Sequence, residues 1–245
     1  MSSRIHLQPA YLLHHRPYRD TSRILELFTQ DHGRVSVFAR GARGAAGKGA
    51  SLMSTLQPFN RLLVSWSGRG EAGQLNGAEF DGAYSALPPD RLISGYYLNE
   101  LILKLFARHD THSDVFALYA HTLDELKTQP DQLRTLRLFE KRLLDALGYG
   151  VALGRDALSG ESLQAGETYH YRLEHGPVRA QRGTDGPLMF SGTSLLSLDR
   201  EELTDAVTCA DARRLLRAAL DRCLEGRELK SRQVMLALRK TRSDG

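Results

Sequence analysis

Residues 10–39 read AYLLHHRPYRDTSRILELFTQDHGRVSVFA, and this stretch decides the fold class. It contains short runs rich in Val, Leu, Ile and aromatic residues, at residues 10–15, 24–29 and 35–39. Turn-forming residues separate the runs, first Arg16-Pro17 and then Asp31-His32-Gly33. Short apolar runs bounded in this way are typical of β-strands joined by tight connections.

Two further runs, at residues 61–66 and 74–80, extend this β pattern. Five short strands at such spacing predict a small closed barrel, and a five-stranded OB-fold is the simplest choice. Between the third and fourth runs, residues 41–50 read GARGAAGKGA. Four glycines, four alanines and two cations cannot build a core, so we expect a mobile loop there.

After Pro88-Pro89 the apolar residues recur at helical spacing. We expect helices at residues 91–108, 113–127, 130–147, 193–202, 211–224 and 231–240. Residues 151–190 predict an irregular insertion that carries a β-hairpin at 168–173 and 178–181. The predicted fold class is therefore α+β. An OB-fold DNA-binding domain (residues 1–82) precedes an α-helical domain (residues 83–245) with the hairpin insertion.

The charge of the chain is unevenly distributed. The formal net charge of the 245 residues is only +4, but residues 1–70 hold ten Lys and Arg against three Asp and Glu, and the remainder holds 23 against 26. The sequence contains no run of 18 apolar residues, so we expect no transmembrane helix. The first residues lack the apolar core of a signal peptide. We therefore expect a cytoplasmic protein whose N-terminal domain meets a polyanion.

The cations of the barrel are the predicted DNA-binding residues. No acidic residue occurs between His32 and Gly70, whereas this interval carries Arg34, Arg40, Arg43, Lys48, Arg61 and Arg69. Such residues neutralise phosphates whatever the base sequence. Tyr18, Phe38, Phe59 and Trp66 lie among them, and we assign Trp66 to base stacking. The alternative for Phe38 and Phe59 is a place in the barrel core.

A second basic surface is predicted on the helix at residues 130–147. Arg134, Arg137 and Lys141 occur at i, i+3 and i+7 and so share one face. The simplest interpretation is a solvated face. The functional alternative is a seat for an acidic peptide segment of a partner protein.

Enzyme signatures are weak. Residues 68–73, GRGEAG, fit G-x-G-x-x-G but precede a strand rather than a helix, so a hairpin turn is the better interpretation. Residues 42–49, ARGAAGKG, lack the first Gly and the final Ser or Thr of a P-loop. We assign no catalytic residue and no cofactor. The alternatives are an OB-domain nuclease or nucleotidyl-transfer enzyme, which needs clustered carboxylates, and an adaptor that binds only protein.

Several stretches together resemble bacterial RecO. They are LLHHRPYRDTSRILELFTQDHGRVSVFARGAR (12–43), LQPFNRLLVSWSGRGE (56–71), YYLNELILKL (96–105), LRLFEKRLLDALGYG (136–150), TYHYRLEHG (168–176) and LKSRQV (229–234). The resemblance implies an N-terminal OB-fold and a helical domain. It also implies DNA repair by a non-enzymatic recombination mediator, which binds single- and double-stranded DNA and anneals strands coated by single-stranded-DNA-binding protein.

The resemblance further implies partners. RecO works with RecR, sometimes alongside RecF, to load the RecA recombinase. The helical domain of some members receives the acidic C-terminal tail of single-stranded-DNA-binding protein, which gives Arg137 and its neighbours a candidate role.

One departure from the family pattern concerns zinc. Many relatives carry a four-cysteine zinc module after the GYG segment, but residues 156–160 read DALSG and residues 151–190 contain no Cys. Because zinc needs deprotonated N or S ligands at tetrahedral spacing, we predict no metal there. The two cysteines of the chain, Cys209 and Cys223, are expected to be reduced thiols in or near a helical core.

Overall fold

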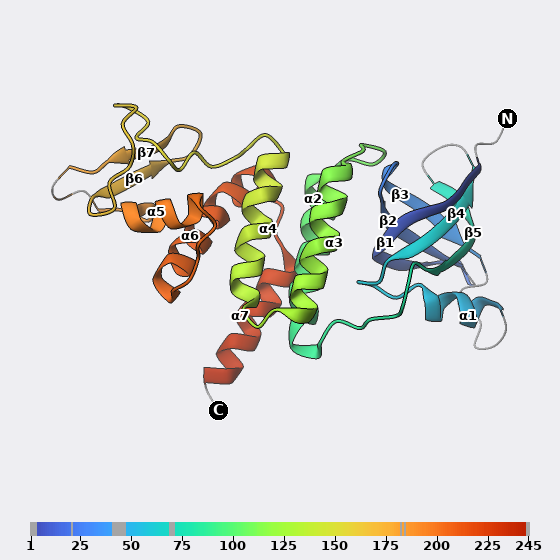
Figure 1. Cartoon of the computed structure of the whole chain (residues 1–245). Coiled ribbons are helices and arrows are strands. Elements are labelled where there is room, and N and C mark those ends of the chain that lie inside the picture. The colour runs from blue at the N-terminus through green and yellow to red at the C-terminus, as the bar shows by residue number, and fades with distance from the viewer. Residues whose placement is uncertain are drawn as a thin grey trace. The chain divides into compact units, whose positions relative to one another are not determined.

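The N-terminal part of the chain is a closed β-barrel. The computed structural model describes residues 4–20, 22–40, 48–68, 72–181, 183 and 185–243. The strands are β1 (Arg4–Tyr18), β2 (Ser22–Thr29), β3 (Gly33–Ala39), β4 (Leu62–Ser67) and β5 (Ala72–Phe80). They close in the order β1-β2-β3-β5-β4, with β3 and β5 parallel and the other neighbours antiparallel (Figure 1). The prediction of a small OB-type barrel is thus confirmed.

The alternation of side chains along the strands fills this barrel. Leu25 and Leu27 on β2 face Val37 and Val35 on β3, and all four point into the buried core. Since side chains alternate along a strand, the residues between them point outward. A bulge between Leu12 and His14 shifts the register of β1 against β2.

A short helix replaces part of the expected loop. Of the glycine-rich stretch at residues 41–50, residues 41–47 lie outside the described part, and Lys48 begins α1 (Lys48–Thr55). Leu52 and Met53 of α1 pack against the barrel core, and Leu56 just after it is buried within it. The stretch therefore ends in a helix that covers apolar barrel residues, which its glycine content did not indicate.

Three helices pack with the barrel in one compact unit. They are α2 (Leu92–Leu105), which follows the short 3-10 helix η1 (Pro89–Arg91), α3 (Ser113–Thr128) and α7 (Lys230–Ser243). The ring of Tyr11 lies 5.0 Å from that of Tyr119, and the ring of Phe28 lies 5.5 Å from that of Phe116. Buried Asn99 of α2 donates to the carbonyl oxygen of Leu13 at 2.9 Å and accepts from the Tyr119 hydroxyl at 2.5 Å. This unit, called unit 1 below, comprises Met1–Thr128 and Leu229–Gly245.

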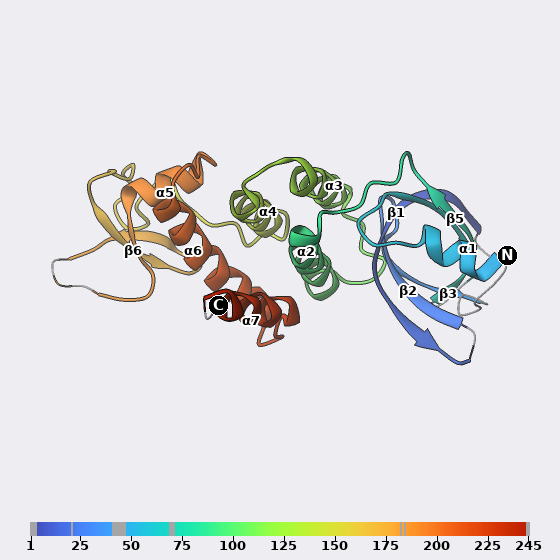
Figure 2. The ribbon, with the colours of Figure 1, turned by 90° about the horizontal axis from the view of Figure 1, so that it is seen from below.

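Unit 2 comprises Gln129–Glu228. It contains α4 (Gln132–Ala146), the sheet β7-β6-β8 made by β6 (Thr168–Arg172), β7 (Gly176–Arg179) and β8 (Met189–Ser191), and the helices α5 (Gly192–Asp199) and α6 (Ala206–Leu224) (Figure 2). The expected hairpin is present, and β8 adds a strand that the sequence did not suggest. Asp131 and Asp205 cap α4 and α6, because each carboxylate accepts two backbone N–H groups of the first turn.

The two units differ from the two expected sequence domains, since α2, α3 and α7 group with the barrel. The reason is the apolar outer face of β1 and β2, which is buried against α2 and α3. None of the helices in the described ranges is long and apolar enough to cross a membrane.

Candidate nucleic-acid interface

The closed end of the β1–β2 hairpin carries cations and aromatic rings on one face. Arg16 is paired with Ile24, which is paired with Phe38, so these side chains share the outer face of the sheet. Tyr18 follows Arg16 by two residues on β1 and lies on the same face, and Arg40 directly follows the end of β3. Figure 2 shows this end of the hairpin extending beyond the other strands.

The aromatic rings of this end are held in place by their neighbours. The rings of Tyr18 and Phe38 are 5.1 Å apart, and the guanidinium carbon of Arg19 lies 5.2 Å above the Tyr18 ring. Both rings are half-buried, whereas Arg16, Arg19 and Arg40 are exposed. Within the described ranges, Arg16 and Arg40 have no acidic partner. We call Arg16, Tyr18, Arg19, Phe38 and Arg40 the hairpin surface.

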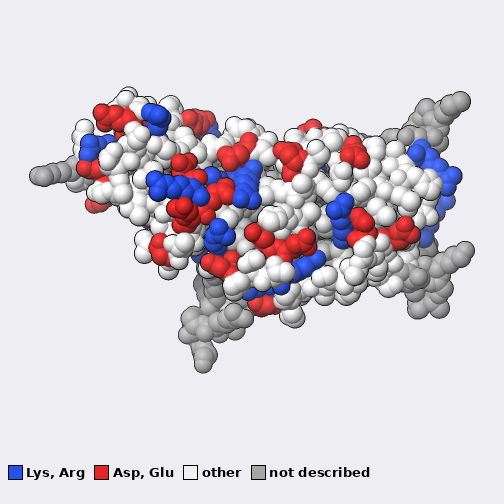
Figure 3. Space-filling model, viewed as in Figure 1, with Lys and Arg blue, Asp and Glu red and all other residues white. Residues whose placement is uncertain are grey.

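This combination suits a nucleic-acid strand. Cations neutralise phosphates and release counterions, and aromatic faces stack on bases. On the face shown in Figure 3, Lys and Arg gather at the end of the barrel with a few acidic side chains near them, whereas both signs are mixed over unit 2.

The inner side of the hairpin end holds a second polar group. Arg23 and the Nδ1 atom of His15 lie 2.8 Å apart, and the rings of His14 and His15 stack at 6.4 Å. Burial, followed by the charges of Arg23 and His14, lowers the pKa of His15. The lowered pKa favours the neutral form of His15, whose Nδ1 atom can accept a hydrogen bond from Arg23.

The predicted DNA-binding residues differ from one another in exposure and in their ionic partners. Arg40 is exposed on the hairpin surface. Arg61 is partly exposed but pairs with Asp81 at 2.7 Å. Arg43 and Arg69 lie outside the described residues, and Lys48 starts α1 with a side chain that is likewise not described.

The side chains of Trp66 and Arg34 are largely buried. Trp66 is 8 % exposed, belongs to the barrel core and meets the His32 ring edge-on at 5.5 Å. The Arg34 side chain is 11 % exposed. Its Nη1 donates to the carbonyl oxygens of Leu103 and Phe106, each at 2.6 Å. We therefore leave both residues out of the interface. Phe38 and Phe59 were the two aromatic residues with the barrel core as an alternative place. Phe59 is buried, while Phe38 lies on the outer face.

Arg34 belongs to an ionic cluster that joins the barrel to the end of α2. Glu26 accepts from Ser36 and from Arg108, both at 2.6 Å, and its second oxygen lies 3.5 Å from Arg34. Burial lowers the pKa of the Arg34 guanidinium, and the charge of Glu26 opposes this effect. The cluster is a structural joint rather than an exposed binding surface.

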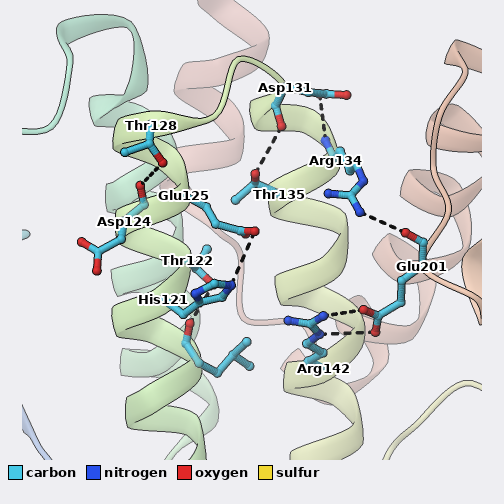
Figure 4. A network of polar contacts seen from close by, with 11 residues as sticks. His121, Thr122, Asp124, Glu125, Thr128, Asp131, Arg134, Thr135, Arg142 and Glu201 are labelled. Atoms are coloured by element: carbon cyan, nitrogen blue, oxygen red, sulfur yellow. Dashed lines mark hydrogen bonds and ion pairs between the residues drawn. The ribbon is translucent and has the colours of Figure 1, made fainter.

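The residues of α4 predicted to bind an acidic peptide already contact other residues of unit 2. Arg137 is 8 % exposed and donates to Glu140 at 2.7 Å. The Lys141 side chain, 13 % exposed, reaches the carbonyl oxygen of Asp199 and the carboxylate of Glu201. Figure 4 shows Arg134 donating to the carbonyl oxygen of Glu201 and Arg142 donating to its carboxylate. These contacts tie α4 to the segment after α5.

Comparison with known proteins decides the family. The model "Recombination protein O N terminal" matches residues 1–84, and "Recombination protein O C terminal" matches residues 88–233. Similar curated proteins, each called DNA repair protein RecO, come from Nitrosococcus oceani (42 % identity), Methylococcus capsulatus (44 %) and Alkalilimnicola ehrlichii (43 %). The matches cover 95–97 % of this chain and 93–95 % of the relatives. The chain belongs to the RecO family. It is thus a member of a family of DNA repair proteins, and the resemblance inferred from the sequence is confirmed.

The place where RecO relatives were expected to carry zinc is organised by a carboxylate. Asp156 accepts backbone N–H groups of Leu158 and Ser159 through Oδ1, at 2.8 and 2.9 Å, and that of Arg179 through Oδ2 at 2.7 Å. These hydrogen bonds lower the pKa of Asp156, and that from the Ser159 backbone N–H contributes most to the shift. Among the described residues, no three His, Cys, Asp or Glu gather as metal ligands. Asp156 thus joins the loop at residues 156–160 to β7 by hydrogen bonds.

Sequence reasoning missed Arg16 and Arg19. It took Arg16-Pro17 as a turn, whereas β1 continues to Tyr18 and brings both arginines to the hairpin end. The sequence did contain a signal, because the cations Arg16 and Arg19 flank the aromatic residue Tyr18. The pairing of β2 with β3 brings this segment near the end of β3, which Arg40 follows.

Proposed function

We propose that the chain is a DNA-binding recombination mediator of the RecF pathway, and that the hairpin surface is its main contact with DNA. The observation that carries this proposal is the juxtaposition of exposed Arg16 and Arg40 with the rings of Tyr18 and Phe38. Family membership adds DNA repair as the setting.

The proposed mechanism is electrostatic. Two strands repel each other through their phosphates, and a surface with cations and few acids screens that repulsion and lowers the barrier to pairing. The half-buried rings of Tyr18 and Phe38 can stack on bases and hold them in an extended, unpaired arrangement, and such stacking is tolerant of sequence. No covalent step is needed, so we assign no catalytic residue and no cofactor.

The partners in this proposal come from the family. We assign RecR, single-stranded-DNA-binding protein through its acidic C-terminal tail, RecF and RecA, and a cytoplasmic, nucleoid-associated location. Arg137 and Lys141 are a poor seat for the acidic tail, because both are already engaged in unit 2. The tail then needs cations outside this face.

Annealing of complementary strands coated by single-stranded-DNA-binding protein tests the function. Arg16→Ala/Arg40→Ala should anneal about ten-fold or more slowly than wild type, since each lost phosphate contact weakens DNA binding. The matched control is Arg172→Ala/Arg200→Ala, which removes two exposed arginines of unit 2. Equal loss in both double variants, or in neither, would remove the hairpin surface from the mechanism. Absence of annealing by wild-type protein would contradict the mediator function itself.

A further inference from the structure

A groove of about 480 Å³ lies within unit 1, beside β1 and between α2 and the start of α7. Most of its exposed lining is apolar. The residues that matter for its chemistry are Leu13, His14, Tyr96, Lys104, Lys230 and Val234. No residue of the hairpin surface lines this groove, and its lining residue Leu103 also accepts a hydrogen bond from Arg34 through its carbonyl oxygen.

An exposed aromatic ring stands at the groove. The Tyr96 side chain is 48 % exposed, and the Phe59 ring supports one side of it, with centroids 5.0 Å apart. A ring fixed by a neighbour and open on its other side is suited to stack on a base, because little conformational freedom remains to be lost.

Two lysines, Lys104 and Lys230, line the groove. Glu100 is the acid of the lining. Its carboxylate accepts from the backbone N–H groups of Lys230 and Ser231 and from the Ser231 hydroxyl, and it lies 4.0 Å from Lys104. These contacts compensate its charge within the protein.

The groove continues the hairpin surface along β1. His14 is paired with Glu26, and Arg16 two residues on is paired with Ile24, so both lie on the outer face. From Leu13 to Tyr18, β1 runs five residues, or about 17 Å at roughly 3.3 Å per residue. A single strand can cover that distance without leaving the protein, since one OB fold typically engages about 4–16 nucleotides.

We propose that a DNA single strand bound to the hairpin surface runs past His14 into this groove, where Tyr96 stacks on a base and Lys230 neutralises a phosphate. This inference rests on the proposed function and adds a second stacking point to it. The occupant is nucleic acid rather than an acidic peptide, because the groove lies along the same strand, β1, as the exposed Arg16 and the half-buried Tyr18 ring of the hairpin surface.

The test compares oligothymidines of two lengths, about 6 nucleotides, near the short end of the range of about 4–16 that one OB fold engages, and about 20 nucleotides, beyond that range. Binding is measured by fluorescence anisotropy for wild type, Tyr96→Leu/Lys230→Ala and the matched control Tyr149→Leu. Tyr96→Leu keeps an apolar contact for Phe59, and Lys230→Ala keeps the backbone hydrogen bond to Glu100. Tyr149 is 58 % exposed and does not line the groove. Thermal unfolding checks that every variant is folded.

The groove variant should bind the long oligonucleotide about ten-fold more weakly and the short one as wild type does, because a short strand stays on the hairpin surface. An equal change for both lengths, or no change for either, would overturn the inference. Arg16→Ala/Arg40→Ala should weaken both lengths, and its failure to do so would count against the proposed function instead. A labelled Asp-Asp-Asp-Leu-Phe peptide is the third probe. If the groove variant loses this peptide while keeping the long strand, the groove binds acidic peptide and the inference is wrong.

Discussion

Arg34 on β3 donates a hydrogen bond of 2.6 Å from Nη1 to the carbonyl oxygen of Leu103 in the last turn of α2. The same nitrogen reaches the carbonyl oxygen of Phe106. The last carbonyl groups of a helix have no partner within it, so a guanidinium from the barrel satisfies them and places a positive charge at the negative end of the helix dipole. A residue that the charge pattern assigned to DNA thus fixes α2 to the barrel.

The role of Arg34 can be measured as stability. Arg34→Ala removes these hydrogen bonds and leaves Glu26 with fewer donors, so we expect the free energy of unfolding to fall by about 2–3 kcal/mol. Urea denaturation followed by circular dichroism gives this value. The control is Arg61→Ala, whose more exposed pair with Asp81 should contribute about 0–1 kcal/mol. A loss below that of the control would mean that Arg34 is not a structural joint.

A second prediction concerns α4. Arg137→Ala leaves the buried Glu140 carboxylate without its close donor, and we expect the free energy of unfolding to fall by about 3 kcal/mol or more. Replacing both partners, as Arg137→Met/Glu140→Leu, should recover most of that loss, since no uncompensated charge remains. The two urea curves decide the point. If Arg137→Ala were as stable as wild type but lost binding to a partner protein, the helix would be the docking face predicted from the sequence.

Asp156 gives a prediction for pH. Its pKa in the folded state lies below the unfolded value of about 3.9, so its stabilising effect is fully present above about pH 4 and is lost as pH falls through the folded pKa. Wild type should therefore exceed Asp156→Asn in thermal stability at pH 7, and the difference should shrink at pH values below about 4. A difference in melting temperature that stays constant across this range would show that the charge of Asp156 is not what stabilises its loop.

Tyr18 tests the stacking part of the interface. Tyr18→Ala should weaken single-strand binding by about 1–3 kcal/mol, the usual contribution of one stacked base, whereas Tyr18→Phe should bind as wild type does. Isothermal titration with an oligothymidine measures both. Equal affinity of Tyr18→Ala and wild type would restrict the interface to its cations.

The barrel was predictable because its strands obey a local rule. Leu25, Leu27, Val35 and Val37 alternate with outward residues, and turn residues separate the runs. Helices α2 to α4 followed equally from helical spacing of their apolar residues. The start of α1 at Lys48 escaped this rule, because Gly49 lowers helix propensity and its helix is stabilised by packing of Leu52 and Met53 on the barrel.

The site was less predictable than the fold. The charge pattern pointed to the barrel, but it could not tell Arg40 from Arg34, since burial of Arg34 depends on residues about seventy positions away. Trp66 was assigned to stacking because the sequence alone does not show that its ring belongs to the barrel core. Arg16 was overlooked because its neighbour Pro17 suggested a turn, whereas the strand runs on.

The most direct test of the central claim is the affinity for a labelled single-stranded oligonucleotide, measured by anisotropy across a salt series. We predict a steep loss of affinity with salt for wild type. For Arg16→Ala/Arg40→Ala, the slope of log affinity against log salt should be lower by about 1.4, at about 0.7 for each lost phosphate contact on a single strand. Weak or salt-insensitive binding by wild type, or an unchanged slope in the double variant, would contradict the account.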